Sequence, residues 1–158
     1  MNKLTAFALV LGLAFCASVP AKQKAVTTLG NVQSQLEIVQ DAERRTCNQV
    51  AFDADAAKPI LACEGPLSTT LGLTTAKHQE FASAMAKAYS LQKRAAIALQ
   101  AWSPGQPAPA ELSGLQTQAQ TVLDFLKALA VTDAQKQMIA SGQALLSEVQ
   151  KVIAAVKG

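Results

Sequence analysis

The chain has 158 residues, of which 50% are hydrophobic, 16% are charged and only 4% are aromatic. Its formal net charge of +3 is small and its basic residues are dispersed, so they do not form a surface that could follow a phosphate backbone. The few aromatic residues give no platform on which bases or sugars could stack. We therefore expect no nucleic-acid partner.

The N-terminal residues are typical of a secretory signal peptide. Lys3 supplies a positive charge, and residues 4–15 form an apolar run that is shorter than the roughly 20 residues needed to span a bilayer. Val19 and Ala21 then provide the small residues that precede a cleavage site. We predict a signal peptide over residues 1–21, a secreted or periplasmic location, and no stable membrane insertion.

Cys16 offers an alternative to simple cleavage, because exported proteins can carry a lipid on an N-terminal cysteine. The enzymes that attach the lipid need a small residue just before that cysteine, and here the preceding residue is Phe15. A lipid anchor at Cys16 is therefore disfavoured. Both alternatives predict export.

Residues 22–158 are enough for one domain with a real core and too few for two. This domain contains an even pair of cysteines, Cys47 and Cys63. In an oxidising compartment such a pair most simply forms a disulfide, which would contribute about 3 kcal/mol by restricting the unfolded chain. A reactive or metal-binding pair would need a nearby histidine or a Cys-x-x-Cys spacing, and neither is present.

Apolar residues recur at helical spacing through most of the domain, with no strand pattern. The apolar stripes begin at Leu29, Phe81, Leu112 and Met138. The expected members are Leu29, Val32, Leu36 and Val39 in the first; Phe81, Ala84, Ala88, Leu91, Ala95, Ala98 and Trp102 in the second, with Met85 and Leu99 beside it; Leu112, Leu115, Ala119, Val122, Leu126 and Leu129 in the third; and Met138, Gly142, Leu145, Val149, Val152 and Val156 in the fourth. They predict an all-α fold, an antiparallel four-helix bundle whose helices span residues 26–50, 75–102, 110–130 and 133–156. In the first helix, Val26 and Val50 are expected to extend the buried face.

Two connections separate these helices. Residues 51–74 are rich in Pro, Gly, Ser and Thr, and we expect a long connection there with a short helical turn around residues 60–63. A connection of this length is unusual in a compact domain, so it either hides a short helix or carries function. Residues 103–109 are Pro-rich and predict a linker.

The last helix carries two further signals. Thr132 and Gln135 form a capping box, in which the threonine oxygen accepts from the amide of Gln135 and the glutamine reaches back. Gly142 lies on the buried face, where it should adjoin a bulky neighbour. Trp102 and Phe125 are the expected candidates.

The sequence gives no reason to assign catalytic, cofactor-binding or metal-binding residues. His78 is the only histidine, and we expect it to be exposed at a helix start, without a nucleophile motif. Haem held by His78 with Met85 or Met138 is disfavoured, because the apolar stripe that begins at Phe81 places His78 at the edge of the buried face, and methionines at helical spacing are usually core residues. We therefore predict no enzyme activity, and an inward-facing His78 against a carboxylate would contradict the basis of that prediction.

The acidic residues also have ordinary explanations. Asp53, Asp55 and Glu64 lack the spacing of a calcium loop. Asp41 is spaced to form a surface ion pair with Arg45. Glu37 and Glu43 share the helix of Asp41 with basic residues, so these charges predict a solvated face and no site.

By elimination, the expected function is that of an exported, non-enzymatic helical bundle that binds a protein partner or assembles with copies of itself. Its surface for this would be an apolar groove or the connection at residues 51–74. The alternative is a binder of a small apolar ligand or of non-covalent haem in the bundle core, because alanine-rich faces could leave a cavity.

Overall fold

The computed structural model describes the backbone of residues 3–158 and the side chains of residues 21–158. Within this part the protein is all-helical, without strands, and none of its helices has both the length and the hydropathy needed to cross a membrane. The helices are α1 (Lys3–Cys47), α2 (Gln49–Ala54), α3 (Pro66–Leu71), α4 (Thr75–Ala101), α5 (Ala110–Lys127) and α6 (Asp133–Lys157). The predicted signal peptide stays a prediction, because residues 1–20, which include Cys16, lie outside the part described with side chains.

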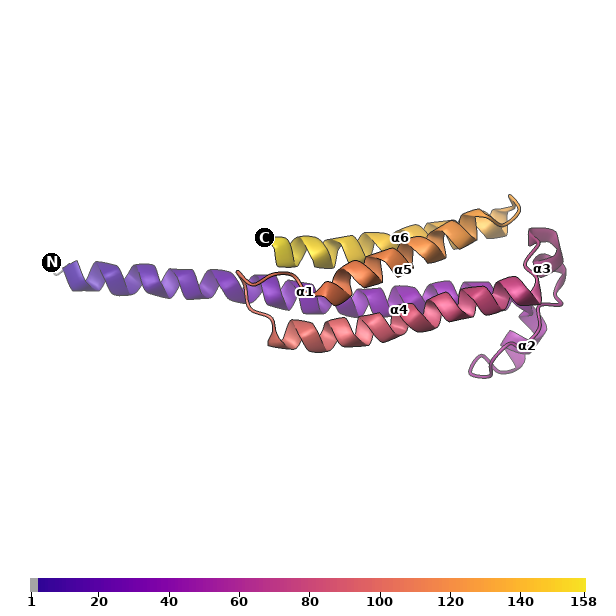
Figure 1. Ribbon diagram of the computed structural model, residues 1–158, viewed down its shortest axis with the longest axis horizontal. Coiled ribbons are helices and arrows are strands. Elements are labelled where there is room, and N and C mark those ends of the chain that lie inside the picture. Colours follow the sequence, from indigo (N-terminus) through magenta and orange to yellow (C-terminus); the bar gives the residue numbers. More distant parts are fainter. Residues whose placement is uncertain (1–2) are drawn as a thin grey trace.

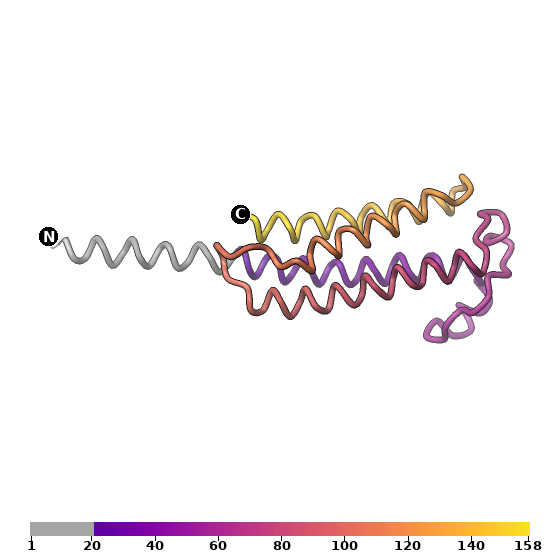
Figure 2. Tube along the Cα trace, in the orientation of Figure 1, coloured from indigo at the N-terminus to yellow at the C-terminus, as the bar shows by residue number. Residues whose placement is uncertain are grey.

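The four long helices lie side by side as a helical bundle (Figure 1). Helix α1 packs against α4 and α6, and α5 packs against the same two helices. The chain reverses direction after α1, after α4 and after α5, as Figure 2 shows along the trace. Consequently α2, α3 and the α5–α6 turn lie at one end, and the α4–α5 linker and the C-terminus lie at the other.

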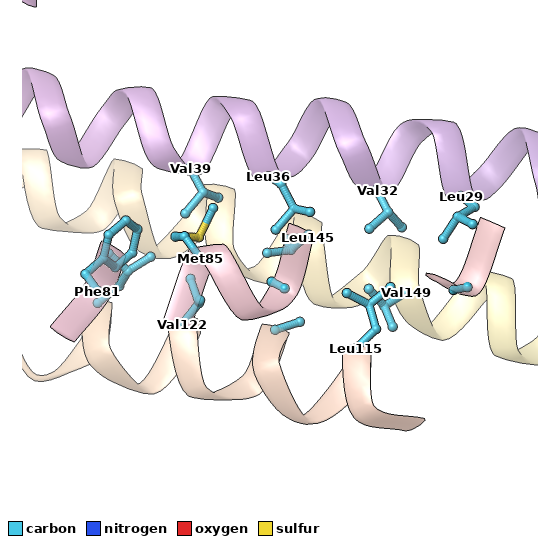
Figure 3. Packing of buried hydrophobic residues seen from close by; sticks show 14 of the residues in the cluster. Leu29, Val32, Leu36, Val39, Phe81, Met85, Leu115, Val122, Leu145 and Val149 are labelled. Carbon is cyan, nitrogen blue, oxygen red and sulfur yellow. The ribbon is translucent and has the colours of Figure 1, made fainter. Parts of the chain in front are cut away.

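The apolar stripes of the long helices meet in one core between them. Figure 3 shows Leu36 of α1, Met85 of α4, Val122 of α5 and Leu145 of α6 directed into the same interior. All four side chains are almost fully buried. The predicted buried faces of the last two helices are confirmed without a shift in register. Leu123 and Gln135 are buried in addition, outside the predicted stripes. The predicted positions that are buried are Leu112, Leu115, Ala119, Val122, Leu126, Leu129, Met138, Gly142, Leu145, Val149, Val152 and Val156.

The predicted limits of the first buried face are wrong. Helix α1 ends at Cys47 because Asn48 leaves the helical conformation and its side chain accepts the amide of Ala51, which caps α2. Val50 therefore lies on α2 and is 81% exposed. At the other limit Ala25 is buried and Val26 is about half exposed.

Helix α4 is rotated slightly from the predicted face. Ala84, Leu91 and Ala98 were expected in the seam and are only partly buried, whereas Met85 and Leu99, expected beside it, are in the core. The buried positions follow alternating steps of three and four. They are His78, Phe81, Met85, Ala88, Gln92, Ala95, Leu99 and Trp102. This face includes two polar residues that the apolar pattern omitted.

The α5–α6 turn confirms half of the predicted capping box. Thr132 Oγ1 accepts the amide of Gln135 at 3.1 Å, but the glutamine side chain does not reach back to Thr132. Gln135 is buried, and its Nε2 donates to the carbonyl of Leu129 at 3.1 Å. Gln135 thus satisfies carbonyl groups near the end of α5, which stops at Lys127, earlier than the predicted residue 130.

Gly142 does adjoin bulky side chains, although the expected partners were wrong. A Cβ added at Gly142 would lie 3.0 Å from Leu126 Cδ1 and 3.2 Å from Leu123 Cδ1. Trp102 instead follows α4 and donates its indole N–H to the carbonyl of Gln106 at 3.2 Å. The glycine therefore allows α5 and α6 to approach closely.

We call residues 48–74 the cap segment. It contains α2 and α3, whereas the helical turn predicted around residues 60–63 is absent. Helix α3 begins with Pro66 and ends at Leu71, and it is capped by Gly72, whose φ of 66° is the left-handed conformation that favours glycine. The amide of Ala130 donates to the carbonyl of Leu71 at 3.0 Å, so α3 is attached to the α5–α6 turn.

Candidate functional site

The predicted disulfide between Cys47 and Cys63 is confirmed. Cys47 is the last residue of α1 and is fully buried, while Cys63 lies in the cap segment, 16 residues further along the chain. Their Cα atoms are 4.5 Å apart, within the range of protein disulfides. The bond therefore ties the middle of the cap segment to the end of α1.

Backbone hydrogen bonds reinforce this attachment. The amide of Gly65 donates to the carbonyl of Cys47 at 3.1 Å, and the amide of Cys63 donates to Thr75 Oγ1 at 3.1 Å. A Cβ at Gly65 would stand only 3.1 Å from the carbonyl oxygen of Cys47, so a glycine suits this close approach. Residues 63–65 are thus held between the end of α1 and the start of α4.

His78 lies in the interior, so the prediction that it is exposed was wrong. It is 7% exposed, in the first turn of α4, and its Nδ1 is 2.8 Å from Oε1 and 3.1 Å from Oε2 of Glu43. Glu43 belongs to α1 and is fully buried. A buried histidine therefore contacts a carboxylate. This arrangement contradicts the basis on which enzyme activity was excluded from the sequence.

The second ring nitrogen defines the protonation of this pair. His78 Nε2 is 2.7 Å from the carbonyl oxygen of Ile60, and because a carbonyl only accepts, Nε2 carries a hydrogen. A second proton is shared between Nδ1 and Glu43. The hydrogen bond to Glu43 raises the pKa of His78, partly opposed by burial, and burial raises the pKa of Glu43. Both shifts keep the shared proton in place.

The disulfide and the ion pair form one cluster. Glu43, Cys47, Cys63 and His78 place one potential metal-ligating atom each within 4.8 Å of one another. The sequence shows no histidine near the cysteines because His78 comes from a different helix. The fold supplies the neighbour that the spacing of the cysteines did not reveal.

A small pocket opens beside the pair. It has a volume of about 120 Å³ and is lined by Pro59, Phe81, Met85 and His78, among others. Sites for drug-sized ligands occupy roughly 300–1,000 Å³, so this pocket is too small for such a molecule. Both nitrogens of His78 are engaged, by Glu43 and by Ile60, which leaves neither free to ligate a haem iron in this arrangement.

The remaining acidic candidates are used in separate surface contacts. Asp53 accepts from Gln49 and pairs with Arg45 at 3.4 Å, while Asp55 pairs with Lys58 at 3.5 Å. Arg45 also stacks over Phe52. The predicted pair of Asp41 with Arg45 is therefore wrong, since Asp41 lies 3.7 Å from Arg44 instead.

A positional signal for the buried pair was available in the sequence. Glu43 follows Leu36 by seven residues, and His78 precedes Met85 by seven, so each occupies the helical register of a core residue. A pattern built only from apolar residues passes over both. Two oppositely chargeable residues in core register on neighbouring helices indicate a buried pair.

Comparisons of the chain with protein-family models, with curated proteins and with solved structures found no match.

Proposed function

We propose that this protein is an exported, non-enzymatic, antiparallel four-helix bundle that binds another protein or a second copy of itself. The binding surface would be the end of the bundle formed by the cap segment and the α5–α6 turn, which we call the capped end. The observation that carries the proposal is the exposure of large apolar side chains there. Val50 is 81% exposed, Leu61 77% and Leu67 45%, all within the cap segment. Val131, in the adjoining α5–α6 turn, is 81% exposed. Four of the seven large apolar side chains that are exposed among residues 21–158 thus lie at this end, and an excess of exposed apolar side chains is typical of an interaction surface.

The attachments of the cap segment support this proposal. The disulfide, the hydrogen bond from His78 to Ile60 and the bond from Ala130 to Leu71 fix the segment at three separate points. A binding segment that is already ordered loses less conformational entropy on association than a flexible one does. The buried pair thereby acquires a structural role, since it joins α1, α4 and the cap segment.

The same contacts support a non-enzymatic role despite the buried pair. A histidine acting as a general base needs one ring nitrogen directed at a nucleophile or a substrate. Both nitrogens of His78 are hydrogen-bonded within the protein, and the nearest sulfur atoms are joined in the disulfide. The pair in this form has no group to activate.

The binding surface can be tested with a photoreactive amino acid placed at Leu61 or at Val131 in the native host. Ile97 is the matched control, because it is 68% exposed but lies near the far end of α4. The same protein adduct from both capped-end positions, and none from Ile97, would support the proposal. An adduct with the chain itself, together with a dimer in sedimentation equilibrium, would identify a second copy. No adduct from either position, or equal adducts from Ile97, would overturn the proposal.

Export is tested separately by the mass of the protein recovered outside the cytoplasm. We expect residues 1–21 to be missing and the mass to be lower by two hydrogens, as one disulfide requires. A full-length chain with free thiols in the cytoplasm would contradict this part of the proposal.

A further inference from the structure

We propose that, once the disulfide is reduced, Glu43, Cys47, Cys63 and His78 bind one Zn²⁺ ion. The four ligand types are those that zinc takes in proteins, and four ligands complete its tetrahedral shell. Their potential ligating atoms already lie within 4.8 Å of one another. Bonds of about 2.0–2.3 Å to zinc place tetrahedral ligand atoms roughly 3.3–3.8 Å apart. Once the disulfide is reduced, the two sulfur atoms must move apart from their bonded distance, whereas the other ligand atoms need only small movements to close around an ion.

The orientation of His78 suits metal binding. The carbonyl of Ile60 accepts the Nε2 hydrogen, so the neutral ring would have its lone pair on Nδ1, the atom that faces Glu43. Histidines that bind metals almost always donate their second N–H to a carbonyl or a carboxylate, which fixes the tautomer and the ring. The zinc ion would take the place of the proton now held between Nδ1 and Glu43.

The backbone also places the ligands on fixed supports. Glu43 and Cys47 are four residues apart in the last turns of α1, which brings both side chains to one face. His78 belongs to the first turn of α4. Only Cys63 comes from the cap segment, where Thr75 and Cys47 hold the neighbouring backbone. One bound ion would thus replace the covalent tie between the cap segment and the bundle.

The charges of the site are compatible with a divalent cation. Two thiolates and a carboxylate carry three negative charges, which zinc reduces to one. Arg44 lies close enough to act electrostatically on both Glu43 and His78, and it also donates to the carbonyl of Lys58. Soft thiolate ligands favour zinc over magnesium and calcium, which prefer oxygen ligands.

The reaction balances with a dithiol as the reductant. The dithiol transfers two electrons and two protons to the Cys47–Cys63 bond, which opens to two thiols while the reductant closes to its own disulfide. Zinc binding then forms two Zn–S bonds, one Zn–N bond and one Zn–O bond. It releases the two thiol protons and the proton shared by Glu43 and His78. In the reverse step a small-molecule disulfide would accept two electrons from the two thiolates and leave as two thiolates, which restores the Cys47–Cys63 bond and releases the ion.

This inference stands apart from the proposed protein-binding function, because it concerns the reduced chain before the disulfide forms or after it is opened. The test uses the full chain with Cys16→Ser, so that Cys47 and Cys63 are its only thiols. Native mass spectrometry and calorimetric titration with Zn²⁺ should show one ion per reduced chain and none per oxidised chain. Mg²⁺ should not compete. Titration with Co²⁺ should give the intense visible bands of tetrahedral coordination and thiolate charge-transfer bands.

Variants separate a four-ligand site from two thiols acting alone. Glu43→Gln and His78→Gln should each weaken zinc binding by roughly tenfold or more. Loss of a group that only hydrogen-bonds a ligand already costs that much, and loss of a ligand itself should cost at least as much. Glu64→Gln is the matched control, because this carboxylate adjoins Cys63 in sequence but is outside the cluster, and it should leave affinity unchanged. Circular dichroism checks that each variant stays helical.

Three results would overturn the proposal. They are the absence of zinc binding by the reduced chain, equal binding by the oxidised chain, and binding that does not depend on Glu43 and His78. If the variants unfold, the cobalt spectrum of the parent chain decides the question, because an octahedral spectrum or one without charge-transfer bands contradicts the site.

Discussion

The α5–α6 hairpin and the capped end are stabilised in different ways. In the hairpin, aliphatic side chains bury one another and Gly142 allows the two helices to approach. At the capped end, a disulfide and a buried ion pair add to the burial of four apolar side chains of the cap segment, Phe52, Ile60, Leu71 and Leu73. Apolar packing tolerates many small adjustments, whereas a buried charge becomes costly as soon as its partner is lost. The two regions should therefore respond differently to substitution.

The largest effect is expected from Glu43→Ala. Removing the carboxylate leaves His78 buried without its partner, and such a change costs about 3–5 kcal/mol of unfolding free energy. The double variant Glu43→Leu with His78→Leu should lose less, since it removes both polar groups. Urea unfolding of the oxidised chain measures both values. A loss below about 1 kcal/mol in Glu43→Ala would show that the pair is not an important tie.

Opening the disulfide should have the next largest effect. Cys47→Ala with Cys63→Ala removes a cross-link over 16 residues, and we expect a loss of about 3 kcal/mol. The loss should appear chiefly as easier opening of the cap segment, which hydrogen exchange can locate. Equal loss of protection throughout α5 and α6 would contradict this assignment to the capped end.

In the hairpin, Gly142→Leu should destabilise the protein by about 1–3 kcal/mol through overpacking against Leu123 and Leu126. Gly30 is a matched control, since it is also inside a helix but has open space around it. Gly30→Ala should stabilise the protein by up to about 1 kcal/mol. Thermal unfolding measures the stability change of both variants. If Gly142→Leu left the stability unchanged, α5 and α6 would be able to move apart with no loss of free energy.

The smallest effect is expected from pH, because raising it removes a single shared proton and leaves the heavy-atom contacts in place. The pKa of His78 is raised in the folded protein, so its stabilising contribution is complete below the ordinary histidine pKa of about 6.5. That contribution is lost as the pH rises through the raised value. The raised pKa of Glu43 acts in the same direction.

We therefore expect the oxidised, metal-free protein to unfold at lower urea concentration at pH 9 than at pH 6. His78→Phe should reduce this difference. Stability that increases over the same interval would contradict the direction of the His78 pKa shift.

Most of the bundle could be predicted because its helices carry regular apolar stripes. In α5 and α6 every predicted stripe position is buried, and Thr132 caps α6 as expected. Helical spacing is a local property, so the pattern of one segment reports on its own buried face. The disulfide was predictable for a different reason, since only two cysteines remain in residues 22–158.

The candidate site could not be predicted in the same way because it depends on contacts between distant segments. Glu43 and His78 are 35 residues apart, and each is explained as a surface charge when it is considered alone. The end of α1 at Cys47 was missed because Asn48 leaves the helical conformation and its side chain caps α2, which the apolar pattern does not reveal. The side chain of Gln135 was assigned to the wrong partner because the carbonyls at the end of α5, to which its Nε2 donates, are brought near only by the turn.

The position of Trp102 has a practical consequence. This residue is the only tryptophan of the chain, and its indole is fixed to Gln106 at the opposite end of the bundle from the cap segment. Its fluorescence will thus report local fraying at that far end and remain insensitive to opening of the cap. A chain that melts in stages should give an emission transition that does not coincide with the transition followed by far-ultraviolet dichroism.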